Sequence, residues 1–244
     1  MVGACHELFQ EKLEAHFLIW YSVIDCQSQY LEFRKTEEKQ VKNMNDKFFD
    51  LKKEKQDRMI NAALKIFSQY GYRFASTDDM VKEAGISKGL LFHYFGSKVG
   101  LYAFVYDYSV RYMTMELKAA IDSKTTDFFK IMKQIEGAKL QILKNYPYMQ
   151  SFLDKCETEN VSEALLAIEE KKQSYNTLYQ LIYEQMDLSI FPDETVATKI
   201  CNMLKYTIRD NMQDHFANSS FNAEMLYEEN IAYIALVESL VTRS

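Results

Sequence analysis

The sequence predicts an all-α protein, and three features support this fold class. Its 244 residues contain only two prolines, Pro147 and Pro192, so little in the chain interrupts helices. Leu, Met, Lys, Glu and Ala, which favour helix, are abundant. Apolar residues recur at spacings of three and four, which is the period of an amphipathic helix. A chain of this length can bury a sizeable core and can hold more than one domain.

The first part of the chain, residues 1–46, is an N-terminal extension whose role stays open. The segment from His6 to Tyr30 is dense in apolar residues and holds the only tryptophan, Trp20. Acidic residues precede this run and no basic start does, so a signal peptide is not expected. Two interpretations remain. Either the segment is a helix that packs on the body or on a partner, or translation starts at Met44.

The first clear helix follows a charged segment, residues 47–55. Apolar residues from Met59 to Tyr70 lie on one stripe, and the helix is predicted to stop at Gly71. Five of the seven glycines of the chain lie at or soon after this point, up to Gly100. Sharp backbone turns are therefore concentrated in this stretch.

Two short helices are predicted next, and they form a helix-turn-helix. Ser76 stands three residues before Asp79, a spacing typical of a reciprocal cap at the start of a helix. Gly85 permits a left-handed turn, and Ser87 can cap the third helix, Lys88 to Phe95. In a helix-turn-helix the second helix is shaped to enter the major groove of DNA.

The order of residues from Ala62 to Leu101 resembles the TetR family of bacterial transcriptional regulators. Glycines, caps, aromatic and basic residues agree with the family in spacing: Ala63, Phe67, Gly71, Ser76, Thr77, Asp78, Asp79, Met80, the run Ala84 to Gly89, His93, Tyr94, Phe95, Ser97, Lys98 and Leu101. The resemblance implies a DNA-binding head, residues 47–101, and a larger helical body for effector binding and dimerisation, residues 102–244. It does not cover the body.

The resemblance also implies which residues touch DNA. They are Ser76, Thr77, Lys88, Gly89, Leu90, His93, Tyr94 and Lys98. Hydroxyls and free amides at the start of the second helix can hold a phosphate oxygen, although capping alone would explain the two hydroxyl residues there. Lys88 can reach a guanine edge or a phosphate, and Tyr94 with Lys98 is expected to clamp a phosphate.

Two positions depart from the family pattern. Leu90 stands where a small hydroxyl residue is frequent, and Phe92 stands where a tyrosine commonly contacts phosphate. Leu90 could contact thymine methyl groups, whereas Phe92 can act only by packing. The segment before the first helix could lie along the DNA backbone through its lysines, or it is simply a solvated helix start.

Six longer helices are predicted after the head. They run from Tyr102 to Ile121, Thr126 to Asn145, Tyr148 to about Cys156, Val161 to Met186, Asp193 to about His215, and Asn222 to Val241. Many aromatic and methionine residues lie on them, and ordinary core packing explains each one. The resemblance implies that some line a pocket for an apolar or aromatic small-molecule effector: Phe128, Met132, Met149, Phe152, Tyr175, Tyr179 and Tyr183.

The last two helices are the expected homodimer interface, again by resemblance. The apolar residues expected to form it are Ile200, Leu204, Ile208, Ile231 and Ile234. Two-fold pairing would place two heads on one palindromic operator.

Charge and cysteine content indicate which partners, redox state and location to expect. Residues 47–101 hold ten Lys or Arg against six Asp or Glu, whereas the whole chain has a net charge of −6. A basic head fits contact with phosphate, although an excess of this size could also be chance. The four cysteines lack a CxxC spacing and are expected to be reduced, and no cofactor or metal is expected. No apolar run spans a bilayer, so a soluble cytoplasmic protein is expected.

The most favoured function is a repressor that binds operator DNA as a homodimer and is released by a small effector. A helical interaction protein that has lost specific DNA binding is one alternative. An enzyme is a weaker one, because no catalytic triad, phosphate loop or paired-carboxylate motif is recognisable.

Overall fold

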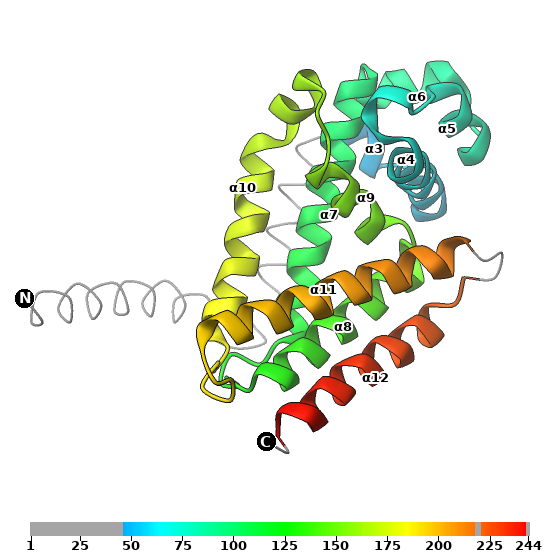
Figure 1. Cartoon of the computed structure of the whole chain (residues 1–244). Coiled ribbons are helices and arrows are strands. Elements are labelled where there is room, and N and C mark those ends of the chain that lie inside the picture. Colours follow the sequence, from blue (N-terminus) through cyan, green and yellow to red (C-terminus); the bar gives the residue numbers. More distant parts are fainter. Residues whose placement is uncertain (1–45, 218–220, 243–244) are drawn as a thin grey trace, which may run out of the picture. The chain divides into compact units, whose positions relative to one another are not determined.

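The computed structural model describes residues 46–217 and 221–242, all of which belong to one compact unit, Met44–Ser244 (Figure 1). The two interpretations of residues 1–45 lie outside the described part of the chain. The described residues are all-α, as predicted, with ten helices. The division into head and body at residue 101 stays a prediction.

The helices follow one another along the chain with short connections. They are α3 (Asp46–Phe49), α4 (Lys53–Phe74), α5 (Thr77–Ala84), α6 (Lys88–Phe95), α7 (Lys98–Ala120), α8 (Phe128–Asn145), α9 (Met149–Glu157), α10 (Ser162–Gln185), α11 (Glu194–Ala217) and α12 (Ala223–Val241). None of the helices described is long and apolar enough to cross a membrane.

The first helix of the head is broken at the predicted residue. Gly71 has φ 66° and ψ 177°, so α4 loses its helical conformation there before a last short turn to Phe74. The head core lies between α4, α5 and α6, where Leu64, Phe67 and Leu91 are buried. Phe48 of α3 is also fully buried, and its ring packs 5.2 Å from that of Phe95 and 5.1 Å from that of Phe104.

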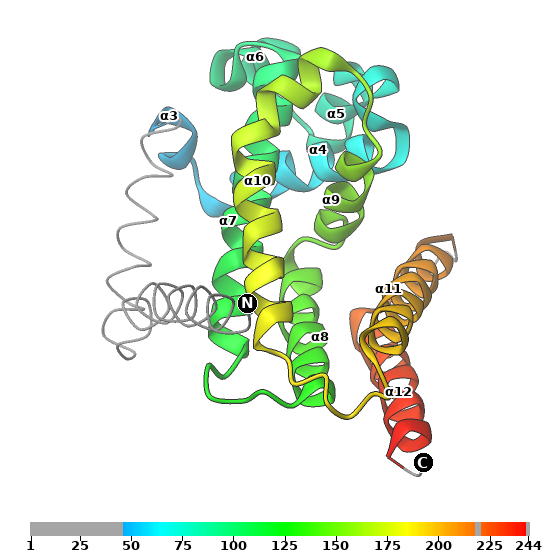
Figure 2. The same ribbon diagram turned by 60° about the vertical axis from the view of Figure 1, so that its left-hand side comes forward.

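The body is built around two long helices, α7 and α10, that lie side by side in both views (Figures 1 and 2). Helix α8 packs on α7 and on α12, and α11 packs on α12. The short helix α9 packs on α4 and so brings the body against the head. Large side chains such as Tyr106, Phe128 and Phe152 fill the interior of the body.

The predicted helix bounds agree with the structure to within two residues, except at the start of α7. That helix begins at Lys98 and not at Tyr102, because the Ser97 hydroxyl accepts a hydrogen bond from the Gly100 amide at 3.0 Å and caps it. A Cβ at Gly100 would overlap the carbonyl oxygen of Phe95. Helix α7 therefore leaves the recognition region through a turn that only glycine can fill.

Candidate nucleic-acid interface

The turn between α5 and α6 holds these two short helices in a fixed relation. Gly85 adopts φ 64° and ψ 43°, the left-handed conformation that suits glycine, and the Ile86 amide donates a hydrogen bond to the Val81 carbonyl at 3.0 Å. The pattern closes the last turn of α5 and reverses the chain into α6. The geometry is that of the predicted helix-turn-helix.

Both helices are capped by serine, as expected. Ser76 Oγ accepts a hydrogen bond from the Asp79 amide at 3.3 Å, and Ser87 Oγ accepts one from the Leu90 amide at 3.2 Å. Each hydroxyl satisfies one of the amides that a helix start leaves without a partner. Both starts keep further amides directed outward, where an anion can bind.

The recognition helix α6 has one buried and one exposed side. Leu91 and Phe95, four residues apart, are buried in the head. Lys88, Gly89 and His93 are exposed on the opposite side. The side that carries the predicted DNA contacts is therefore the side that the head leaves uncovered.

Lys88 is paired within the head, which sequence reasoning did not foresee. Its Nζ lies 2.8 Å from Asp78 Oδ1 in the first turn of α5, and both side chains are exposed. Exposed pairs of this kind contribute little to stability. A DNA phosphate or base edge can therefore compete for Lys88 at low cost.

Gly89 has no packing reason to be glycine, because a Cβ there would meet nothing within 4 Å. Next to it, Leu90 is half-buried. Tyr94 is half-buried too. Its ring packs edge-on against two others, with ring centroids 5.8 Å apart for Phe48 and 5.1 Å apart for His93. The core thus orients Tyr94 while His93 stays exposed.

Residues 59–104 match the family model described as bacterial regulatory proteins, tetR family. This match covers most of the predicted DNA-binding head. A 49-residue segment is 47% identical to the uncharacterized HTH-type transcriptional regulator YuxN of Bacillus subtilis (strain 168), covering 20% of this chain and 17% of that relative. The fold is similar to that of a TetR family transcriptional regulator from Chloroflexus aurantiacus J-10-FL, with TM-score 0.53, 20% identity, and coverage of 81% of this chain and 96% of that one.

Lys98, which is predicted to bind a phosphate, is the first residue of α7 and is held against the head. Its Nζ lies 4.8 Å from the centre of the Tyr72 ring and 3.3 Å from the carbonyl oxygen of Arg73, to which it donates. Burial lowers the pKa of Lys98. The ammonium group is therefore engaged within the chain in this structure.

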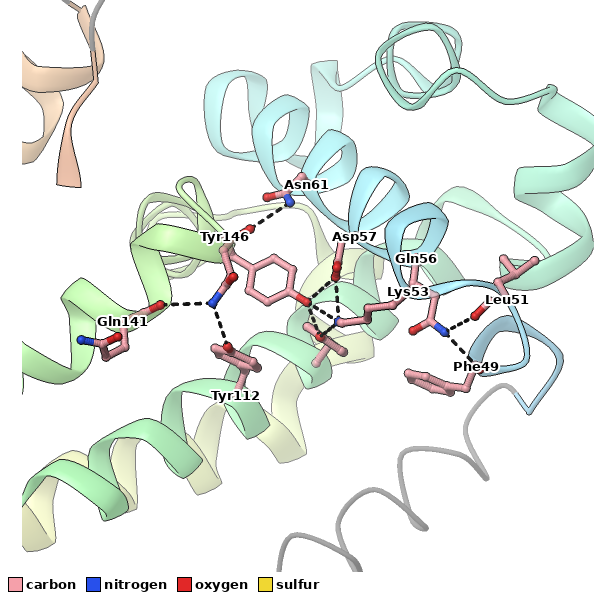
Figure 3. Close-up of polar contacts among 11 residues, drawn as sticks. Phe49, Leu51, Lys53, Gln56, Asp57, Asn61, Tyr112, Gln141 and Tyr146 are labelled. Atoms are coloured by element: carbon pink, nitrogen blue, oxygen red, sulfur yellow. Dashed lines mark hydrogen bonds and ion pairs between the residues drawn. The ribbon is translucent and has the colours of Figure 1, made fainter.

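Lys53, one of the lysines expected along a DNA backbone, lies instead at the junction of head and body. Figure 3 shows it beside Asp57 and Tyr146. Lys53 Nζ donates a hydrogen bond to Asp57 Oδ1 at 2.7 Å and one to the Tyr146 hydroxyl at 2.8 Å. The Tyr146 hydroxyl donates to Asp57 Oδ1 at 2.6 Å and lies 2.6 Å from the Tyr108 hydroxyl. We call Lys53, Asp57, Tyr108 and Tyr146 the tyrosine network.

The residues expected to line an effector pocket fall into separate groups. Phe128 packs against Phe191, with ring centroids 5.1 Å apart. Phe152 packs against Tyr102 and Tyr106. Met132 and Met149 are buried. Tyr175, Tyr179 and Tyr183 form a row along α10.

Charged groups lie beside that row, and sequence reasoning missed them. Lys139 Nζ pairs with Glu136 Oε1 at 2.8 Å, and Asn230 donates to Glu136 Oε2 at 2.9 Å. Burial raises the pKa of Tyr179, and the Lys139 charge acts in the opposite direction. The signal for this site was an i, i+3 charge pair on the otherwise apolar side of α8.

The structure corrects the expected set of interface residues on the last two helices. Leu204, Ile208 and Ile234 are buried within the chain, and Ile200 and Ile231 are half-buried against the same core. They cannot all form an outer surface. The large apolar side chains that α11 and α12 expose are others: Met203, Tyr206, Met225, Tyr233, Leu236 and Leu240.

Proposed function

We propose that this protein is a transcriptional regulator that binds double-stranded DNA with α6 in the major groove. The observation that carries the proposal is the uncovered side of α6, where Lys88, Gly89 and His93 project from a capped helix-turn-helix. This arrangement presents a cation, a bare backbone and an aromatic ring to a base edge.

The remaining contacts position the head on the phosphates. Ser76 and Thr77 open α5, where free amides and hydroxyls hold a phosphate oxygen. Tyr94 and Lys98 flank the end of α6 and bind a neighbouring phosphate. Leu90 contacts thymine methyl groups.

The experiment is a fluorescence anisotropy titration with the DNA upstream of the gene and with a duplex of unrelated sequence. Lys88→Ala should reduce the preference for the upstream DNA by about five- to 150-fold, the range of one lost base contact. Lys130→Ala, an exposed lysine of α8, is the matched control and should change nothing. Equal affinity of the wild type for both duplexes would contradict sequence-specific binding.

Lys98→Ala provides the complementary test. A phosphate contact carries no base information, so affinity should fall about equally on both duplexes. The salt slope of log K should decrease by about 0.9, the value for one phosphate. An unchanged slope would exclude the phosphate role of Lys98.

We further propose a homodimer formed by the exposed apolar sides of α11 and α12. Leu236 is 56% exposed and Tyr206 54%, and paired copies would cover both. Leu236→Glu should give monomers in sedimentation velocity at micromolar concentration. Leu166→Glu, on the 74% exposed Leu166 of α10, is the control and should stay dimeric. A monomeric wild type would refute this interface.

The regulatory proposal is a repressor whose operator affinity falls when a small apolar or aromatic effector binds between the body helices. The row Tyr175, Tyr179 and Tyr183 supports an aromatic ligand, and Lys139 could supply a polar contact. An effector must bind the two arrangements of the body unequally, so DNA must alter effector affinity by the same factor. Calorimetric titration of an effector with and without operator tests this, and equal affinities would exclude the coupling.

A further inference from the structure

The turn at the end of α4 is joined to the start of α10 by two carboxylates. The Tyr72 hydroxyl donates a hydrogen bond to Glu163 Oε2 at 2.6 Å, and the Tyr72 amide donates one to Glu159 Oε2 at 2.9 Å. The other oxygen of Glu159 accepts from the amides of Asn160 and Val161. Glu159 therefore bridges the head and the segment that leads into α10. We call Tyr72, Glu159 and Glu163 the latch.

The latch is closely fitted. A Cβ at Gly71 would lie 3.3 Å from Lys155 Cε and 3.6 Å from Glu159 Oε2, and the φ of 66° independently favours glycine. The Tyr72 side chain is buried, and its ring packs 5.2 Å from that of Tyr102. A displacement of the start of α10 is therefore transmitted to Tyr72.

Lys98 lies on this latch. Its ammonium group sits over the Tyr72 ring, and the carboxylates of Glu163 and Glu159 counteract the effect of burial on its pKa. Cation–π contact and two nearby negative charges both stabilise the ammonium group where it is. A DNA phosphate must therefore compete for Lys98 with the Tyr72 ring and with both carboxylates.

We propose that the latch is an autoinhibitory contact that keeps Lys98 from DNA phosphates. This inference rests on the proposed function, in which Lys98 binds a phosphate. Glu159 and Glu163 act as positioning residues, because they act on DNA through Tyr72 and Lys98. Since Glu163 lies in the first turn of α10 and Glu159 in the segment just before it, a movement of that helix in the body releases Lys98 without any change in α7.

The variant Glu163→Gln removes the charge and keeps the shape. Glu169→Gln, an exposed position on the same helix, removes the same charge away from the latch and is the matched control. The probe is a duplex of arbitrary sequence, because a phosphate contact needs no operator. We expect Glu163→Gln to bind about three- to fivefold tighter than the wild type, with the control within about 1.5-fold. The salt slope should stay the same, because Lys98 reaches one phosphate in both proteins and only the cost of releasing it differs.

A double-mutant cycle shows whether the gain passes through Lys98. Glu163→Gln should bring no gain in a Lys98→Ala background, whereas an equal gain in both backgrounds would overturn the proposal. Glu159→Gln, which removes the other negative charge near Lys98 and keeps the shape, should tighten binding in the same direction and provides the test if Glu163→Gln fails to fold.

The outcomes also separate this proposal from the proposed function. If the wild type binds DNA and neither Glu163→Gln nor Glu159→Gln binds more tightly, the latch is refuted while the proposed function stands. If neither the wild type nor the variants bind any duplex, the proposed function fails and the latch fails with it. Binding that appears only in the latch variants would support complete autoinhibition.

Discussion

The head meets the body at two polar contacts of different construction, the tyrosine network and the latch. In the tyrosine network, the buried hydroxyl of Tyr146 joins Lys53, Asp57 and Tyr108, so a positive and a negative charge balance around a phenol. In the latch, the buried Tyr72 faces two carboxylates. The nearest cation over its ring is Lys98, a candidate DNA contact.

Because the two contacts differ in construction, we expect one to act on the stability of the fold and the other on the regulation of DNA binding. Removing the buried Tyr146 hydroxyl breaks its hydrogen bonds with Lys53, Asp57 and Tyr108 together, and the folded state loses free energy. The latch carboxylates can turn toward water, so their loss costs the fold less. Their charge acts instead on the group that would bind phosphate. We therefore expect the tyrosine network to affect mainly unfolding and the latch mainly DNA affinity.

The largest effect is expected in the aromatic core beside the latch, where Tyr102 packs against both Tyr72 and Phe152. Phe152 is fully buried and its ring packs against Phe67 of α4 and Tyr102 of α7. Phe152→Ala should lower the free energy of unfolding by about 3–5 kcal/mol, measured by urea unfolding. Leu166→Ala, at an exposed apolar residue, should change it by less than about 0.5 kcal/mol. Similar losses in both variants would show that Phe152 does not support the junction.

The next effect distinguishes the two contacts directly. Tyr146→Phe should lower the free energy of unfolding by about 1–3 kcal/mol, because it breaks the three hydrogen bonds of a buried hydroxyl. Tyr72→Phe should cost about 0.5–1.5 kcal/mol, since Glu163 is exposed and water replaces the lost bond. Tyr70→Phe, at a 52% exposed tyrosine, is the control. A larger loss from Tyr72→Phe than from Tyr146→Phe would reverse the assignment of roles.

The helices and turns that carry the residues of these two contacts could largely be predicted from the sequence. The turn at Gly85, the caps at Ser76 and Ser87 and the break at Gly71 are local, because each depends on a backbone conformation or a hydroxyl within four residues. The helix-turn-helix and the family followed from them. The body helices were predictable because prolines and caps mark their ends.

The contacts themselves could not be predicted. Tyr72 and Glu163 are 91 positions apart, and periodicity carries no information about such a pair. The sides of α12 were also ambiguous, because apolar residues occur all round the helix. Ile234 is fully buried, whereas Leu236, two residues on, is exposed. Packing against α8 and α11 decides which side of α12 is buried.

The pH dependence of stability should sharpen the comparison further. Burial and the bond to Glu163 raise the pKa of Tyr72 to about 12, and burial also raises the pKa of Tyr146. Both contributions are present below pH 10.0, the ordinary tyrosine value, and are lost as the pH rises above it. Both contacts therefore weaken in alkali.

Only the latch should also weaken in acid through Glu159. Burial opposes ionisation, but hydrogen bonds from Tyr72, Val161 and Asn160 lower the pKa of Glu159 below 4.5. A lowered pKa stabilises the fold above pH 4.5, and this contribution is lost as the pH falls through the folded-state value. Urea unfolding from pH 7 to pH 3 should show a shallower acid decline for Glu159→Gln. The same decline as in the wild type would remove Glu159 from the acid response.

The smallest effect is expected at a third polar link, beside the tyrosine network. Asn61 Nδ2 donates to the Asn145 carbonyl at 3.0 Å, while Asn61 Oδ1 is buried without a hydrogen-bond partner (Figure 3). Asn61→Ala loses a bond of about 1 kcal/mol but also removes an unsatisfied acceptor of similar cost. The exposed Asn145 carbonyl can bind water in its place. The free energy of unfolding should therefore change by less than about 0.5 kcal/mol, and a loss above about 1.5 kcal/mol would show that Oδ1 has a partner in solution.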